Sequence, residues 1–99
     1  MGWRDEIAAA RARISGHVVR TPVVELDLDL PCGPVAMKLE QMQHTGSFKA
    51  RGAFNTLLGG DVPDAGIVAA SGGNHGAAAA YAARRLGHGA KIFVPEMAG

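Results

Sequence analysis

Hydrophobic and polar positions recur at helical spacing at the start of this 99-residue chain. Apolar side chains at Trp3, Ile7 and Ile14 fall on one stripe, which predicts a helix over about residues 4–14 with a packing face. Ser15-Gly16 then ends it, because glycine readily adopts the left-handed conformation that follows a helix. The chain therefore opens with one amphipathic helix.

The next segment changes to the two-residue period of an extended chain. Acidic residues at 25, 27 and 29 alternate with leucines at 26, 28 and 30, which is typical of a half-buried strand rather than of a carboxylate site. Proline and glycine between residues 31 and 34 predict a turn, and a second strand follows over residues 35–40. We expect Glu40, at the end of that strand, to pair with Arg51 or Lys38.

A second helical stretch carries a lysine in an unusual place. Gly46-Ser47 predicts a turn with a serine N-cap, and a helix continues from there until the glycine pair at 59–60. Lys49 and Arg51 then lie in the first turn, where the helix dipole disfavours cations. A residue that departs from such a preference is a candidate for function, and a lysine amine is a nucleophile that forms Schiff bases. A solvated surface lysine is the alternative interpretation of this segment.

A strand, a glycine-rich turn and a helix follow one another later in the chain. Residues 66–70 form an apolar run that predicts a buried strand, and the alanine-rich stretch 75–86 predicts a helix that Gly87 caps. Residues 90–94 predict a second buried strand, and therefore a β-α-β unit. The turn Ser71-Gly72-Gly73-Asn74-His75-Gly76 leads into the helix N-terminus, where backbone N–H groups and the dipole favour an anion.

The same turn has a second interpretation, as the phosphate turn of a dinucleotide-binding unit. Gly73 and Gly76 have the spacing of that motif, and Glu96 follows the next strand, where a ribose-binding acid would lie. Ser71, however, occupies the place of the motif's first glycine, and a dinucleotide site has no need of the lysine turn. We therefore favour an anion site that works together with Lys49.

Composition and charge argue against several other classes. The formal net charge is +1 with scattered basic residues, so no nucleic-acid surface is expected. The four histidines are dispersed, so no metal site is expected. The lone Cys32 allows no internal disulfide, which fits a reducing compartment. No apolar run approaches the roughly 18 residues of a membrane span, and we expect a cytoplasmic protein without membrane or nucleic-acid partners.

Two motifs in this order resemble those of a known enzyme family. Residues 38–52 and 70–76 are similar to the lysine and asparagine motifs of the pyridoxal-phosphate enzymes of the threonine dehydratase and serine racemase family, which have fold type II and are tryptophan synthase β-like. The similarity extends from Arg20-Thr21-Pro22 to residues 92–96. It implies an α/β fold of two lobes with three αβα layers, of which this chain would be an N-terminal fragment. The intact enzyme would be a homo-oligomer.

The resemblance also implies where the lobes divide and what the motif residues do. Residues 1–62 would belong to the larger, lysine-bearing lobe, and residues 63–99 would begin the smaller lobe, with pyridoxal 5'-phosphate (PLP) between them. By this resemblance, Lys49 would form the Schiff base and also move the Cα proton. Phe48 would pack beside the cofactor ring, and Asn74 would bind its phenolic oxygen. The substrate carboxylate would be bound by Ser71, Gly72, Asn74 and His75. No metal is implied.

The implied reaction is the deamination of L-threonine or L-serine to a 2-oxo acid and ammonia. Racemases of the family carry a serine where this chain has Gly72, and glycine offers no second acid–base group, so dehydration is favoured over racemisation. The family's phosphate-binding loop lies in a later segment of its chains. We therefore expect these 99 residues alone to bind PLP weakly, to be inactive, and to be best ordered over residues 66–95. A catalytically dead fragment that acts only by association through unpaired strand edges is the alternative.

Overall fold

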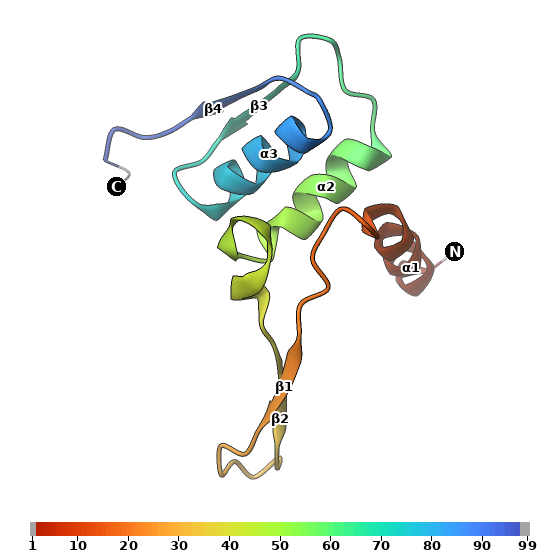
Figure 1. The fold of residues 1–99 in the computed structure, drawn as a ribbon, viewed down its shortest axis with the longest axis vertical. Helices are drawn as coiled ribbons and strands as arrows, with labels where there is room; N and C mark the ends of the chain where they lie inside the picture. The colour runs from red at the N-terminus through yellow and green to blue at the C-terminus, as the bar shows by residue number, and fades with distance from the viewer. Residues whose placement is uncertain (1, 98–99) are drawn as a thin grey trace.

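The computed structural model describes residues 2–97 of the chain. These residues form helices and short strands, as Figure 1 shows. The elements are α1 (Trp3–Ile14), β1 (Val23–Leu26), β2 (Val35–Lys38), the 3₁₀ helices η1 (Glu40–Met42) and η2 (His44–Gly46), α2 (Lys49–Gly59), β3 (Ile67–Ala70), α3 (Asn74–Arg85) and β4 (Ala90–Phe93). The predicted α/β class is confirmed.

The hydrophobic core lies where the three α-helices meet. Phe54 and Ala50 of α2 are buried against Ala78 and Ala82 of α3, and Ile14 joins them from the end of α1. The small side chains of α3 let α2 approach closely at these positions. This core draws on residues from both sides of the lobe boundary predicted near residue 62.

Helix α1 reaches this core only with its last turn. Its bounds are close to the predicted ones, and Gly16 follows it with a φ of 85°. Ile14 is buried, but Trp3 and Ile7 are 65% and 59% exposed. The prediction that the whole apolar stripe is a packing face is therefore wrong within residues 2–97, where only the C-terminal end of the helix is covered.

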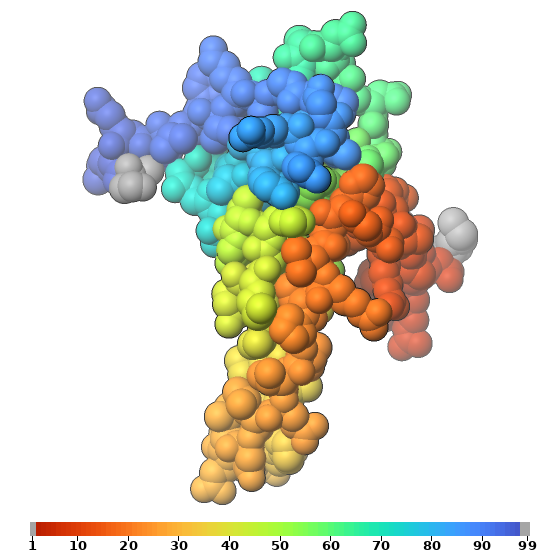
Figure 2. Space-filling view, viewed as in Figure 1, coloured from red at the N-terminus to blue at the C-terminus, as the bar shows by residue number. Residues whose placement is uncertain are grey.

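Strands β1 and β2 form an antiparallel hairpin that projects from the helices as an arm (Figure 1, Figure 2). Val23 pairs with Lys38, and Leu26 pairs with Val35. The strand predicted to reach residue 30 is wrong beyond Leu26, since the chain turns there and Asp29 has a φ of 56°. The leucines at 26, 28 and 30 are exposed because none of the helices in residues 2–97 packs broadly on this arm.

Strands β3 and β4 form a parallel pair that α3 connects. Ile67 pairs with Ala90, and the pairing continues to the ends of both strands. Helix α3 lies against the face that carries Ile92, and a Cβ added to Gly76 would meet Ile92 Cγ2 at 3.0 Å, so glycine allows this close approach. Val68 is 69% exposed on the other face. The predicted full burial of these strands is therefore wrong, because helices within residues 2–97 cover one face only.

Candidate functional site

The lysine turn is built from two short helical segments between β2 and α2. Thr45 and Gly46 both have positive φ values, 62° and 81°, which reverse the chain direction before α2. Ser47 Oγ accepts a hydrogen bond from Lys49 N at 3.3 Å, but the N-cap position of α2 is Phe48, one residue after the predicted serine N-cap. Helix α2 begins at Lys49, and Arg51 follows within its first turn, as predicted.

The glycine-rich turn forms an open helix N-terminus. Ser71 Oγ accepts hydrogen bonds from Gly73 N at 3.2 Å and from Gly76 N at 3.0 Å, and it therefore caps α3 from inside the turn. The backbone N–H groups of Asn74 and His75, the first two residues of the helix, have no acceptor within residues 2–97. Two such donors at the positive end of a helix dipole favour a bound anion.

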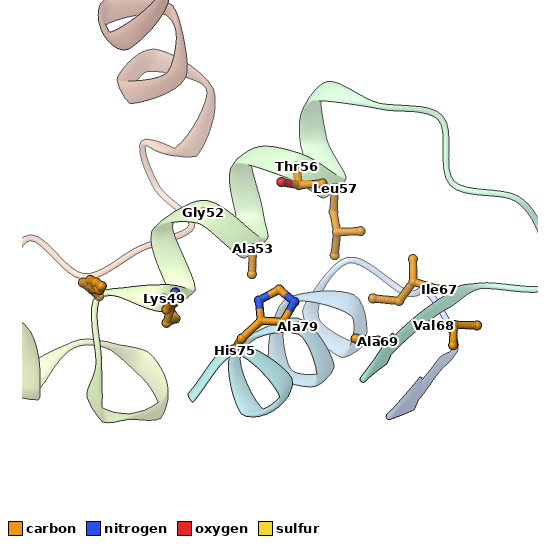
Figure 3. Close-up of a pocket in the computed structure, with 11 residues that line it drawn as sticks. Lys49, Gly52, Ala53, Thr56, Leu57, Ile67, Val68, Ala69, His75 and Ala79 are labelled. Atoms are coloured by element: carbon orange, nitrogen blue, oxygen red, sulfur yellow. The ribbon is translucent and has the colours of Figure 1, made fainter. Parts of the chain in front are cut away.

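A groove of about 600 Å³ runs between α2, α3 and β3, and it brings the two turns to one place (Figure 3). Lys49 borders it from α2, and His75 borders it from α3 (Figure 3). Lys49 Nζ also lies 5.3 Å from the centroid of the Phe48 ring. The lining residues are Phe48, Lys49, Gly52, Ala53, Thr56, Leu57, Ile67, Val68, Ala69, His75 and Ala79.

The predicted site residues fall into two groups relative to this groove. Phe48, Lys49 and His75 line it directly. Ser71, Gly72 and Asn74 belong to the turn beside His75, but they are not among the lining residues. The sequence did not point to the α2 residues that form the groove wall, although Thr56 lies on the lysine face of that helix at the spacing of two turns. A helical projection starting from Lys49 would have found it.

Glu40 forms a network next to the lysine turn. Arg51 donates to it twice, from Nε to Oε1 at 2.5 Å and from Nη2 to Oε2 at 3.1 Å. Thr21 Oγ1 donates to Oε2 at 2.5 Å, while Lys38 Nζ donates to the Thr21 carbonyl at 3.0 Å. The predicted pairing of Glu40 with Arg51 is confirmed. The Arg51 hydrogen bonds, followed by the Thr21 hydrogen bond and the Arg51 and Lys38 charges, hold the Glu40 pKa at about 2 against the opposing effect of desolvation.

Neither a metal centre nor a membrane span is found in the described residues. Among residues 2–97 no group of three or more His, Cys, Asp and Glu side chains could hold a metal ion. In the same part of the chain no helix is both long and apolar enough to cross a bilayer.

The donor set fits a flat, anionic carbonyl compound such as PLP. Lys49 supplies an amine for an aldehyde, and Phe48 and Ala53 supply an apolar wall for a ring. The α3 N-terminus supplies N–H groups for an anion bound beside that ring. These features suit a PLP-binding protein of α/β fold. A family model described as "Pyridoxal-phosphate dependent enzyme" matches residues 14–99, and the chain belongs to this family. The predicted cofactor, PLP, and the predicted fold type II class are confirmed.

Named relatives agree with this assignment. The chain is 43% identical over 98 residues to the catabolic L-threonine dehydratase of Staphylococcus aureus, in a match that covers 94% of this chain and 28% of that protein. Among solved structures, maize serine racemase matches with a TM-score of 0.86 and 38% identity over 96% of this chain and 30% of its own. A threonine deaminase from T.th. matches with a TM-score of 0.74 and 40% identity over 92% of this chain and 32% of its own. The chain thus spans less than a third of each relative.

Proposed function

We propose that this chain carries the lysine and the carboxylate-binding turn of a PLP-dependent ammonia-lyase that converts L-threonine or L-serine to a 2-oxo acid and ammonia. One observation carries the proposal: Lys49 and the open N-terminus of α3 border the same groove. The similarity to a threonine dehydratase and a threonine deaminase supports this choice of reaction.

Each residue of the site has a part in the proposed reaction. Lys49 would hold the cofactor aldehyde carbon through Nζ until the substrate amine displaces it, and the freed Nζ would then take the substrate Cα proton. Phe48 would pack beside the ring, and the Asn74 side chain would donate to the ring's phenolic oxygen. When bound, PLP supplies an electron sink for the charge that develops at Cα.

The substrate carboxylate would bind at the turn from Ser71 to His75. The backbone N–H groups of Asn74 and His75 have no acceptor among residues 2–97, and the Ser71 hydroxyl proton remains able to donate while its oxygen caps the helix. Gly72 brings the backbone close without a side chain in the way. Binding there would orient the Cα proton toward Lys49.

We also propose the division into lobes at residues 1–62 and 63–99, a cytoplasmic location and a homo-oligomeric whole enzyme. The groove between α2 and α3 suits a cofactor held between two lobes. The 99-residue chain by itself should bind PLP weakly and show no turnover. A single imine is reversible, and the resemblance places the phosphate-binding loop in another segment of the family's chains.

A borohydride trapping experiment tests the central assignment. The chain has three lysines, Lys38, Lys49 and Lys91. Incubation with PLP, reduction and peptide mass mapping should place most of the label on Lys49, because of the three only Lys49 lines the groove. A Lys91→Gln variant serves as control and should keep the label. Predominant modification of Lys38 or Lys91 would contradict the proposal.

A non-enzymatic role through association has one observation in its favour. The sheet face that carries Val68 and Phe93 is exposed, and such a face can dock another surface. The trapping experiment separates the two functions, since a purely associating chain has no reason to direct PLP to Lys49.

A further inference from the structure

Arg51 occupies a position that the helix dipole should make unfavourable. It lies in the first turn of α2, two residues after Lys49, and the first turn contains no acidic residue. Two cations at the positive end of a helix oppose its formation. The Arg51 charge is neutralised by a carboxylate from outside the helix, because Glu40 accepts both Arg51 hydrogen bonds. The first turn of α2 therefore depends on a residue from before the lysine turn.

We propose that Glu40 is a positioning residue for Lys49: its carboxylate ties the first turn of α2 to the segment before β1 and so fixes the lysine at the groove. This inference rests on the proposed function, because it takes Lys49 as the lysine that binds the cofactor. Glu40 is not among the residues that line the groove, and its hydrogen bonds to α2 go to Arg51, so it would act through Arg51.

A second residue, Gln43, also anchors the loop before Lys49 to the segment before β1. Gln43, which is 4% exposed, accepts a hydrogen bond from Val19 N and donates to Val19 O, both at 2.8 Å. Thr21, which is 3% exposed, donates to Glu40, and Leu39 N donates to Pro22 O. These hydrogen bonds hold the segment before β1 against the loop that leads to Lys49. Among these contacts, only those of Glu40 continue into α2.

Loss of the Glu40 charge should act locally. The Arg51 guanidinium would keep its place at the positive end of α2 without a carboxylate, and the buried Thr21 hydroxyl would face a weaker acceptor. Helix α3 shares no hydrogen bond with this network in residues 2–97. A general structural role would instead weaken α2 and α3 together, because both contribute to one core.

Amide hydrogen exchange on the full 99-residue chain separates these two outcomes. In a Glu40→Gln variant, the amides of Gly52 and Ala53 should exchange about tenfold faster or more, because a charge-assisted hydrogen bond is lost. The amides of Ala82 and Ala83 in α3 should change by less than about twofold. Glu25→Gln is the matched control, since Glu25 is an exposed strand carboxylate, and it should leave all four rates unchanged.

A double variant tests whether Glu40 acts through Arg51. Glu40→Gln combined with Arg51→Gln removes the unpaired cation as well as the carboxylate, so the Gly52 and Ala53 rates should return most of the way to wild type. Equal acceleration in α2 and α3, or equal effects of Glu40→Gln and Glu25→Gln, would overturn the proposal. The proposal would also be overturned if the Gly52 and Ala53 amides exchanged as fast in the double variant as in Glu40→Gln.

PLP labelling gives a second readout and keeps the two hypotheses apart. Relative to Lys91, which has no part in the Glu40 network described above, the reduced label on Lys49 should fall about three- to tenfold in Glu40→Gln and stay constant in Glu25→Gln. If wild-type chain shows no preference for Lys49, the proposed function fails, while the exchange rates still decide the role of Glu40. The exchange rates could respond as expected while the label on Lys49 stays unchanged. In that case Glu40 holds the first turn of α2 but does not position Lys49, and the proposal is wrong.

Discussion

At the residue scale, the pKa of Glu40 depends on the folded state. Its pKa of about 2 lies below the ordinary value of 4.5 because Arg51, Thr21 and Lys38 stabilise the carboxylate. A lowered pKa in the folded state means that the stabilisation is complete above about pH 4.5 and is lost as the pH falls toward 2. Acid should therefore weaken the Glu40 contribution to folding.

Urea unfolding at several pH values measures this contribution. Above about pH 5 the wild-type chain should exceed Glu40→Gln in free energy of unfolding by about 1–3 kcal/mol, a range that allows for partial solvent screening. The difference should shrink steadily between pH 4.5 and pH 2. A difference that stays constant over that interval would mean that the carboxylate charge has no part in the network.

Gly72 gives a prediction about reaction choice. A glycine at this turn offers no second acid–base group, so under the proposed function Lys49 would be the residue that exchanges the Cα proton. The test is a chimera in which residues 14–97 replace the aligned segment of the Staphylococcus aureus dehydratase. It should release 2-oxo acid from L-serine at least about tenfold faster than it forms D-serine, while Gly72→Ser should raise D-serine formation. Equal rates of the two products in the glycine form would show that another group replaces the serine.

The sequence predicted individual residues well where a local rule was broken or a charge needed a partner. Lys49 and Arg51 stand out because cations are disfavoured in a first helical turn. Glu40 was expected to pair with Arg51 or Lys38, and it pairs with Arg51. The capping role of Ser71 was not predicted, because its contact with Gly76 depends on how the glycine turn folds back. No periodic pattern reports that geometry.

At the scale of elements, the link between the lysine turn and α3 joins the two parts of the site. Tyr81 of α3 stacks on His44 of η2 with ring centroids 4.8 Å apart, and its hydroxyl lies 3.1 Å from His44 Nδ1. Phe54 of α2 meets Tyr81 edge to face at 6.1 Å. Three elements therefore share one aromatic cluster next to the lysine turn, which helps keep Lys49 and His75 at a fixed separation.

The start of β3 gives a prediction about a glycine. Gly66 has a φ of 93°, and an added Cβ would lie 2.2 Å from the Gly89 carbonyl oxygen, which accepts from Ile67 N. Gly66→Ala should lower the free energy of unfolding by about 2–4 kcal/mol, since strain and overpacking add. Gly52→Ala is the control: its site on α2 is open, so alanine should stabilise by about 0.5–1 kcal/mol. Urea unfolding measures both, and a Gly66→Ala change below about 0.5 kcal/mol would contradict the expected strain.

Element types followed the sequence because helix and strand periods, caps and glycine stops are local signals. Strand burial did not follow it. An apolar run such as residues 66–70 predicts a strand, but whether both faces are covered depends on elements distant in the chain. In residues 2–97, α3 covers one face, and Val68 remains exposed on the other. The hairpin leucines are exposed for the same reason.

At the scale of the whole molecule, the described chain is extended rather than compact. Its radius of gyration is 16.2 Å, against roughly 13 Å for a compact domain of about 100 residues. The hairpin arm and the segment after β4 project from the helical body in Figure 2. Burial is therefore concentrated in a small part of the molecule, which is the packed region between α2 and α3.

Because burial is concentrated between α2 and α3, the structure predicts a different best-ordered region from the one that the sequence predicted. The sequence favoured the β-α-β unit over residues 66–95 as the best-ordered part. The structure instead places α3 in one core with α2, while β3 and β4 keep an exposed face and outer edges that pair with no other strand of residues 2–97. Strands with one covered face and no further neighbours open more readily than a helix pair around buried side chains.

Amide exchange on the wild-type chain tests this expectation across the whole molecule. The slowest amides should be those of Phe54, Ala78 and Ala82, because their helices surround the core and must separate before exchange. Amides of β3 and β4 should exchange at least about tenfold faster, and those of the β1–β2 hairpin faster still, since an isolated hairpin is marginal in water. Slowest exchange in β3 and β4 would instead mean that the sheet is the stable nucleus, and that the helix α2 bearing Lys49 forms on it afterwards.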